Sequence, residues 1–217
     1  MNNKIIIAID AMGGENAPFK TIEGVSVFLK KNKNNNDVFF NLYGNEELIK
    51  KEIVKYNIFT NQYKIFPSST IVSDEETPLT AIKNSKDSSM WNSINSQITS
   101  NSNITLSAGN TGVLFVVSRM LLKTIDSVSK PALAGLWPNE KNMHVVLDLG
   151  ANVECDEKNL IDFSEMGAAL YKALFPADTP RVALLNIGSE EIKGTEILKK
   201  THAKLKKISL NGDFVFD

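Results

Sequence analysis

The sequence is poor in the residues on which many catalytic and metal sites depend. Its 217 residues include one cysteine, Cys155, and two histidines, His144 and His202. One cysteine excludes an internal disulfide and a cysteine-based metal cluster, and it fits a reducing compartment. Glu154 and Asp156 flank Cys155 and would raise a thiol pKa, which disfavours a cysteine nucleophile. With two histidines and no complete nucleophile motif, a Ser-His-Asp triad is disfavoured too.

Long hydrophobic runs and an excess of charge are also missing. The apolar run at residues 4–9 is stopped by Asp10, well short of the about 20 residues that a membrane-spanning helix needs. The same interruption comes too early for a signal-peptide core, which predicts a cytoplasmic protein. Twenty-four basic and 25 acidic residues give a net charge of -1, so we expect no nucleic-acid partner. Metal ligands are not clustered, and we expect neither a metal nor a cofactor.

Short β-branched runs alternate with longer stretches of helical period along the chain. This alternation predicts repeated βαβ units and an α/β fold with a mostly parallel sheet. The predicted strands cover residues 4–9, 38–43, 63–66, 104–107, 131–136, 144–149, 181–187 and 213–216. The predicted helices cover residues 18–31, 46–56, 80–99, 111–125, 157–175 and 190–207. Because no Pro-rich or Gly/Ser-rich linker interrupts the pattern, we expect residues 1–217 to form a single α/β domain.

Four of the predicted strands end in polar, glycine-containing turns just before a helix. In a parallel sheet the carboxyl ends of the strands lie on one edge, where ligands bind, so we expect these turns to meet in one crevice. Glycine lets the backbone approach a ligand, and N–H groups at a helix N-terminus favour an anion. The segment 107–112 is therefore either a phosphate cradle or a plain turn capped by Asn110 or Thr111. The four turns are residues 10–16, 107–112, 148–152 and 186–189.

Familiar nucleotide-binding signatures are absent. Residues 188–195 contain a lysine and glycines in an order that differs from a P-loop, with two glutamates where phosphates would lie. No G-x-G-x-x-G follows the first strand, so a dinucleotide site has no support. Within residues 78–90, Lys83 and Lys86 share a face of a predicted helix, where they hold an anionic substrate or simply face solvent.

Five motifs follow one another over nearly the whole chain. They are IAIDAMGGENAP at residues 7–18, KDSSM at 86–90, SAGNTG at 107–112, LDLGAN at 147–152, and LLNIG at 184–188 followed by Lys193-Gly194. In this order and spacing they resemble the phosphate acyltransferase family of bacterial phospholipid synthesis (PlsX, acyl-ACP:phosphate transacylase).

The resemblance implies a three-layer α/β/α sandwich similar to phosphotransacetylases and isopropylmalate-dehydrogenase-like enzymes. It implies transfer of a fatty acyl group from acyl-[acyl carrier protein] to inorganic phosphate, giving acyl phosphate for phospholipid synthesis. The implied partners are acyl carrier protein, inorganic phosphate and a second copy of the chain in a homodimer. The implied location is the cytoplasm, peripheral to the inner membrane face. Phosphate is itself the nucleophile in this reaction, so no acyl-enzyme is required.

The resemblance and this chemistry together suggest site residues. Asn110 and Asn152 would donate hydrogen bonds, and either Lys86 or Lys193 would supply a counter-charge. The expected catalytic residues are Asp10, Asn110, Asn152 and Lys193. The residues expected to bind substrate or phosphate are Gly13, Gly14, Asn16, Lys86, Ser88, Ser89, Ser107, Gly109, Thr111, Gly112, Asp148, Gly150, Asn186 and Gly188. Backbone N–H groups of Gly13-Gly14 and residues 109–112 would cradle phosphate, and either Asp10 or Asp148 would position these groups.

The sequence departs from the family pattern in two places. Lys83 stands for an arginine and Ser85 for a lysine, which weakens contact with the carrier protein or with phosphate. The family's next motif, Phe-x-Gly-Asn-x-Glu-Gly, would begin near Phe214, whereas the sequence stops at Asp217. We therefore expect the N-terminal part of a longer chain. A truncated remnant that only binds ligand and a phosphotransacetylase acting on acyl-CoA are the alternative functions.

Overall fold

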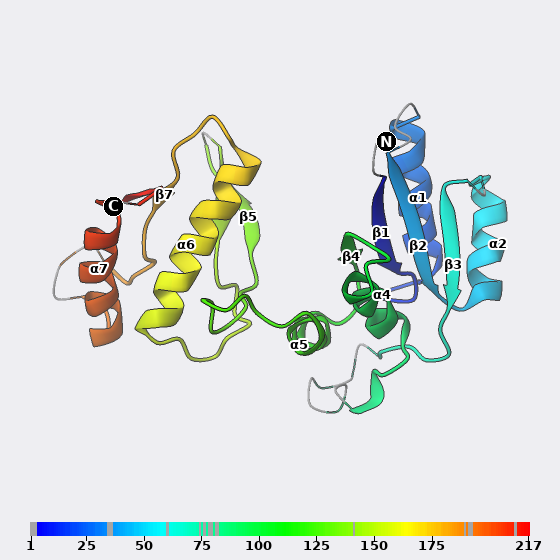
Figure 1. Cartoon of the computed structure of the whole chain (residues 1–217), viewed down its shortest axis with the longest axis horizontal. Helices are drawn as coiled ribbons and strands as arrows, with labels where there is room; N and C mark the ends of the chain where they lie inside the picture. Colours follow the sequence, from blue (N-terminus) through cyan, green and yellow to red (C-terminus); the bar gives the residue numbers. More distant parts are fainter. Residues whose placement is uncertain are drawn as a thin grey trace. The chain divides into compact units, whose positions relative to one another are not determined.

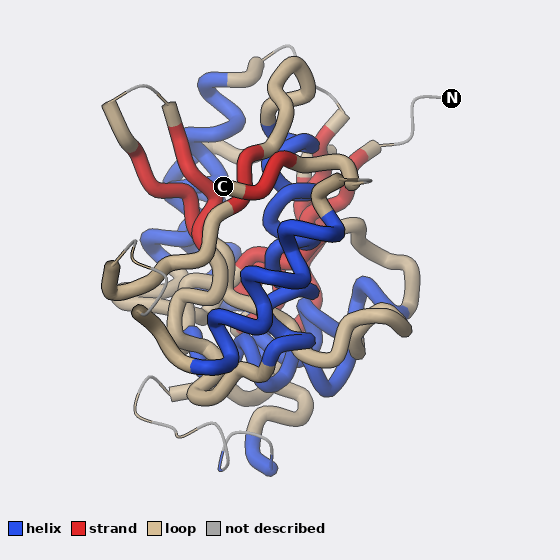
Figure 2. The backbone as a smooth tube through the Cα atoms, turned by 90° about the vertical axis from the view of Figure 1, so that its left-hand side faces the viewer, coloured by secondary structure: helices blue, strands red, loops and turns tan. Residues whose placement is uncertain are grey.

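In a computed structural model, the chain forms two compact units, Met1–Lys123 and Thr124–Asp217. Figure 1 shows the helices and strands of both units, and each unit has its own hydrophobic core. Figure 2 marks the helices, strands and loops along the backbone. The prediction that residues 1–217 form a single α/β domain rests on the absence of a linker signal at this boundary. It stays a prediction. The structure describes residues 4–33, 37–59, 61–73, 75, 77, 80, 83–140, 142–188, 190, 193–210 and 212–217.

The first unit is built on a four-stranded parallel sheet with the strand order β3-β2-β1-β4. The four predicted strands of this unit agree with the observed ones to within one residue at each end. Parallel pairing follows from the chain itself, because a helix separates each strand from the next one to be added. The strands are β1 (Ile5–Asp10), β2 (Val38–Gly44), β3 (Tyr63–Pro67) and β4 (Ile104–Leu106).

Helices cover both faces of this sheet. Ile9, Phe40 and Leu42 point to one face and share a core with α1 and α2. Asn41 lies on the opposite side of β2, and its Nδ2 donates a hydrogen bond to the carbonyl of Asn101, just after α4. This layered arrangement confirms the predicted α/β fold class. The helices are α1 (Phe19–Lys31), α2 (Glu46–Tyr56), α4 (Ser89–Ile98) and α5 (Thr111–Leu122).

The helix predicted over residues 80–99 is interrupted in the structure, because residues 80, 83 and 84 are helical and a separate helix, α4, begins at Ser89. Ser88 is the N-cap of α4, because its extended backbone takes it out of the helix and its hydroxyl accepts a 3.1 Å hydrogen bond from the N–H of Trp91. Asp87, with φ 64°, turns the chain just before this cap. Lys83 and Lys86 therefore do not share one helix face. Residues 78, 79, 81 and 82 of the predicted segment lie outside the described residues.

The described residues of the second unit form two small sheets and two helices, with α6 between the β5–β6 hairpin and α7 (Figure 1). The predicted parallel alignment does not hold for β5 and β6, which pair antiparallel. Only residues 139–142 join them, whereas a parallel connection needs a dozen residues or more. The elements are β5 (Gly135–Pro138), β6 (Met143–Val146), α6 (Glu157–Leu174), β7 (Arg181–Val182), α7 (Glu196–Ile208) and β8 (Val215–Phe216).

Two predicted elements of this unit differ most in length from the observed ones. The helix predicted from residue 190 begins at Glu196, because Thr195 caps it and Gly194 adopts φ +88° just before the cap. The strand predicted at 181–187 is reduced to β7, which pairs in parallel with the two residues of β8. No helix in the described parts of the chain is long and apolar enough to cross a membrane.

Candidate functional site

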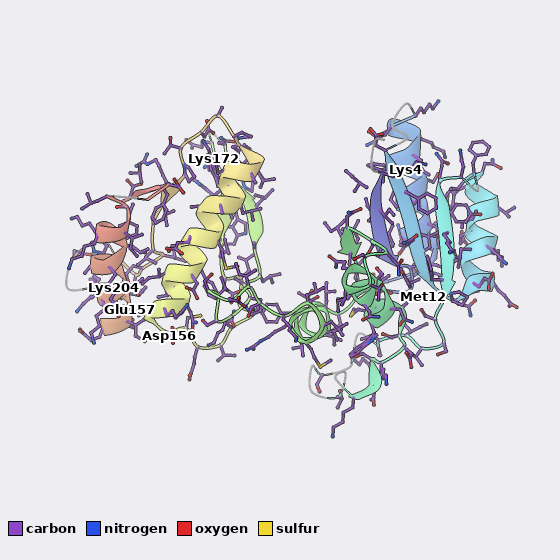
Figure 3. All side chains as sticks on the ribbon, in the orientation of Figure 1. Lys4, Met12, Asp156, Glu157, Lys172 and Lys204 are labelled. Carbon is purple, nitrogen blue, oxygen red and sulfur yellow. The ribbon has the colours of Figure 1, made fainter. Side chains whose placement is uncertain are left out.

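A hydrogen-bond network centred on the buried Asp10 joins the carboxyl ends of β1 and β4. Asp10, the last residue of β1, is 2% exposed, and its Oδ2 accepts a 2.8 Å hydrogen bond from the Ser107 hydroxyl. Ser107 Oγ in turn accepts the backbone N–H of Gly109 at 3.1 Å. The N–H of Met12, a residue labelled in Figure 3, donates to Asp10 Oδ1 at 3.3 Å. One carboxyl group thus ties the turn after β1 to the turn after β4.

The environment of Asp10 favours its neutral form. Burial raises the pKa of Asp10 above its ordinary value of 3.8. Hydrogen bonds from the Ser89 and Ser107 hydroxyls and from the backbone of Met12 and Gly13 act in the opposite direction but do not cancel the effect of burial.

The raised pKa of Asp10 predicts a pH dependence of stability. The folded state binds the Asp10 proton more tightly than the unfolded state, so this group lowers the free energy of unfolding as the pH rises from 3.8 through the folded pKa. In Asp10→Asn this titration is gone, and urea unfolding across that pH range should show the variant gaining stability relative to the wild type. Glu15→Gln, at an exposed side chain of the same turn, is the matched control. Parallel pH profiles for Asp10→Asn and the wild type would contradict the prediction.

Two glycines allow the turns after β1 and β4 to touch. A Cβ on Gly13 would lie 2.5 Å from Asp10 Oδ2 and 2.9 Å from the backbone nitrogen of Gly109. Gly14 has φ +91°, and its Cβ would lie 2.7 Å from the carbonyl oxygen of Ala108. The sequence predicts close approach of backbone to a ligand at these glycines. The structure shows close approach of one turn to the other, which shapes the same edge of the sheet.

Two helices begin beside this network. Ser89, in the first turn of α4, is buried and hydrogen-bonds to Asp10. Asn110 is the N-cap of α5, with its Oδ1 accepting the N–H of Val113 at 3.1 Å. Thr111 and Gly112 form the first turn of α5. The first N–H groups of a helix have no intrahelical acceptor and favour an anion, so two such ends flank the joined turns.

The side chains of the other candidate residues in the first unit differ in exposure and in the hydrogen bonds that they already make. The Ser88 hydroxyl is engaged as the cap of α4. Asn16 is exposed, with φ 58°, and Lys86 is exposed on the turn that leads into α4. The structure also points to Ser85, whose hydroxyl is buried and has no hydrogen-bond partner within the described part of the chain. Its burial depends on how residues 85–88 turn, which no local sequence pattern indicates.

In the second unit, Asp148 stabilises the turn that follows β6 through hydrogen bonds to its carboxylate. Its Oδ1 accepts the N–H of Leu133 at 2.7 Å, and its Oδ2 accepts the N–H of Asn152 at 2.7 Å. The Asn152 amide donates to Asp148 Oδ2 at 3.2 Å and to the carbonyl of Pro131 at 2.9 Å. Both N–H bonds of this amide are thus engaged within the protein. Gly150, with φ +85°, completes the turn.

Asn186, Gly188 and Lys193 lie together in the loop before α7. A Cβ on Gly194 would lie 2.8 Å from Asn186 Oδ1, and a Cβ on Gly188 would lie 3.2 Å from Lys193 Cγ. Lys193 is exposed, and its backbone N–H donates to the carbonyl of Glu190 at 2.9 Å. The structure therefore brings Asp10, Gly13, Ser89, Ser107 and Gly109 together in the first unit, and it forms two groups of candidate residues in the second. Their meeting in a single crevice stays a prediction.

The comparison with known proteins decides the family. Residues 5–215 match the family described as "Fatty acid synthesis protein". The chain belongs to this family. A phosphate acyltransferase from Pelagibacter ubique (strain HTCC1062) is 49% identical over 216 residues, which cover 100% of this chain and 63% of that protein. A phosphate acyltransferase from Ehrlichia ruminantium (strain Gardel) is 37% identical over 204 residues, which cover 94% of this chain and 60% of that protein.

This member of the fatty acid synthesis protein family thus spans about three fifths of the length of these curated relatives. Among solved structures it is similar to the EutD phosphotransacetylase from Staphylococcus aureus, with a TM-score of 0.70 and 12% identity over 100% of this chain and 68% of that chain. A phosphotransacetylase from Streptococcus pyogenes gives a TM-score of 0.69 and 13% identity over 99% of this chain and 67% of that chain. At such identities the likeness shows the fold alone, and it agrees with the predicted fold class.

Two further side chains that could react, Cys155 and His202, lie among groups that do not activate them. Burial raises the pKa of the Cys155 thiol, and Asp148 and Asp156 add to the effect while Lys130 opposes it. The His202 ring packs edge-on against Phe216, with 5.2 Å between the ring centroids. In the described ranges, no group of three or more His, Cys, Asp or Glu side chains could hold a metal ion.

Proposed function

We propose that this chain transfers a fatty acyl group from acyl-[acyl carrier protein] to inorganic phosphate, giving acyl phosphate for phospholipid synthesis. The observation that carries the proposal is the network of the buried Asp10 with Ser107 and Gly109, which holds two glycine turns together beside the N-termini of α4 and α5. Such an arrangement favours a small anion through backbone N–H groups. The relatives that are named phosphate acyltransferase support the same reaction.

In the proposed reaction a phosphate oxygen attacks the carbonyl carbon of the thioester. A tetrahedral oxyanion forms and collapses with cleavage of the C–S bond, so the carrier protein leaves as a thiolate that takes up a proton. The acyl group remains on phosphate as the mixed anhydride. The protein's part is to hold the dianion beside the thioester and to stabilise the oxyanion, which needs positioned donors and no nucleophilic side chain.

The role proposed for each residue depends on the hydrogen bonds that it already makes within the protein. The N–H groups of Thr111 and Gly112 at the start of α5 would bind phosphate, with the Asn110 side chain beside them, whereas the Gly109 N–H is already donated to Ser107. Asp10 would act as a positioning residue for both turns. In the second unit, Asp148 would position Asn152 through the backbone and side-chain hydrogen bonds between them.

The proposal includes the setting of the reaction. Acyl carrier protein and inorganic phosphate would be the substrates, and the chain would act as a homodimer in the cytoplasm, in peripheral contact with the inner membrane face. These points rest on the resemblance of the five motifs to the family.

A trapping assay tests the proposed function. The purified chain is incubated with acyl-[acyl carrier protein] and phosphate, and acyl phosphate is converted to the hydroxamate with hydroxylamine. A parallel reaction contains acyl-CoA in place of the carrier protein. Product from the carrier-protein thioester supports the proposal. Product from acyl-CoA alone would replace it with a phosphotransacetylase activity, and phosphate binding without either product would replace it with a ligand-binding remnant.

Substitution of the two candidate lysines tests the counter-charge. We expect Lys193→Ala or Lys86→Ala to reduce acyl-phosphate formation by about tenfold, because a charge-assisted hydrogen bond to phosphate is lost. Both side chains are exposed, so neither change should alter the unfolding midpoint. Lys51→Ala, at an exposed position of α2, is the matched control. If neither variant falls below the control, the counter-charge lies elsewhere.

A further inference from the structure

Helix α7 carries an unusual balance of charge. Its sequence EILKKTHAKLKKI contains five lysines and one glutamate. Helix α2, of similar length and also on a surface, contains three lysines and three glutamates, with Lys50 paired to Glu46 at 2.6 Å and Lys55 to Glu52 at 3.4 Å. Helix α1 contains three lysines and one glutamate, so the lysine excess of α7 is larger than that of α1 or α2.

The lysines of α7 differ in whether they have acidic partners. Lys204 pairs with Glu157 of α6, both labelled in Figure 3, and Lys199 pairs with Glu196 at 3.3 Å. The remaining three are exposed, and no acidic side chain pairs with them in the part of the chain that the structure describes. These three residues, called the lysine strip below, are Lys200, Lys206 and Lys207.

The lysine strip faces away from the core of its unit. Leu205 is fully buried in a cluster with Ala168 and Phe214, and Ile208 packs against that cluster. At 3.6 residues per turn, Lys200 and Lys207 lie on the outer side of the helix, about 10 Å apart along its axis, and Lys206 lies about 100° around the helix from Lys207. The N-terminal end of the same helix follows directly on the loop that contains Lys193 and Gly194.

We propose that the lysine strip of α7 is a docking surface for an acidic protein face, which under the proposed function belongs to the acyl carrier protein. The proposal rests on that function for the identity of the partner. Three uncompensated positive charges complement an acidic surface and speed its encounter with the chain. A carrier protein docked there would lie on the helix that directly follows the candidate site loop with Lys193 and Gly194. This position would allow an acyl group on a flexible arm of the carrier protein to reach that loop.

A protein fits this surface better than a lipid bilayer does. An amphipathic helix that lies in a membrane interface inserts its apolar side between lipids. The apolar side of α7 is occupied, because Leu205 and Ile208 pack in the core. The outer face offers lysines and Ala203 at its centre, which can meet a charged protein surface without insertion.

A binding experiment on the full chain tests the proposal. Anisotropy of a fluorescently labelled carrier protein is titrated with wild type, with Lys200→Glu/Lys206→Glu/Lys207→Glu and with the corresponding glutamine variant. Glutamine removes the charges without placing acidic groups at the helix C-terminus, where they would destabilise the helix. The matched control carries the same charge change in the first unit, as Lys31→Glu/Lys33→Glu/Lys51→Glu.

We expect the glutamate variant to weaken binding at least about tenfold, the glutamine variant to weaken it less, and the control to stay within twofold of wild type. Equal losses in the control, or unchanged binding in both strip variants, would overturn the proposal. Unchanged carrier binding with lost binding to phosphatidylglycerol vesicles would assign the strip to a membrane instead.

Activity separates this proposal from the proposed function. If the strip variants form acyl phosphate with an unchanged KM for the carrier protein, the docking proposal alone is overturned. If the carrier protein binds through the strip but the wild-type chain forms no acyl phosphate, the proposed function alone is overturned.

Discussion

Gly13→Ala is expected to reduce acyl-phosphate formation at least about 100-fold, because it forces apart the two turns that form the candidate phosphate site. The added Cβ would lie 2.5 Å from Asp10 Oδ2 and 2.9 Å from both Ser107 Oγ and the Gly109 nitrogen. Backbone and a buried carboxyl cannot move as a surface side chain can. We therefore also expect the free energy of unfolding to fall by about 3 kcal/mol, as in an overpacked core. Hydroxamate trapping and urea unfolding measure the two effects.

Gly24→Ala is the matched control for this prediction. Gly24 lies inside α1, and a Cβ there would meet no atom within 4 Å. Alanine favours a helix over glycine by up to about 1 kcal/mol, so this variant should be at least as stable as wild type and fully active. Wild-type activity in Gly13→Ala would show that the contact between the turns is not needed for the reaction.

Asn110→Ser is expected to reduce acyl-phosphate formation about 100-fold while leaving the fold intact. Serine caps a helix about as well as asparagine, so its hydroxyl can replace Oδ1 as the acceptor for the Val113 N–H. What serine lacks is the amide, which we propose donates to phosphate or to the developing oxyanion. The thermal midpoint should therefore stay close to that of wild type while the rate falls.

A second helix provides the control for the capping role. Asn45 caps α2, and its Oδ1 accepts the Leu48 N–H at 3.0 Å. Asn45→Ser makes the same chemical change at a helix end that contributes nothing to the candidate site. It should match Asn110→Ser in stability and match wild type in activity. Equal activities of the two serine variants would leave Asn110 with a capping role only.

Much of the first unit can be predicted from sequence because its strands carry strong local signals. Apolar β-branched runs bounded by Asn, Gly and charged residues define β1 to β4 to within one residue. The break within the helix predicted over 80–99 is not visible in the sequence, because helical periodicity continues through the segment while the Ser88 hydroxyl and the turn at Asp87 interrupt it locally. Antiparallel pairing of β5 and β6 follows from the short connection between them, a constraint that an alternating βαβ pattern hides.

The candidate site residues are visible in sequence because glycine and asparagine mark the turns. Their interactions are not visible, because they join distant positions. Asp10 and Ser107 are 97 residues apart, and nothing local to either one indicates that a buried carboxyl will meet a hydroxyl. The engagement of the Asn152 amide by Asp148 and Pro131 is hidden in the same way. Residue types thus indicate the location of a site, while burial and long-range contacts determine which groups remain for a ligand.

The separation of Asp10 and Ser107 along the chain also bears on how the first unit folds. Their hydrogen bond closes a loop of 97 residues, and closing a long loop costs conformational entropy before the contact stabilises anything. Strand β4 must therefore dock beside β1 before the two glycine turns meet. A folding intermediate that contains only β1, β2 and β3 has no joined turns and no site for phosphate. Phosphate bound at these turns would accordingly slow unfolding and leave the early steps of folding unchanged.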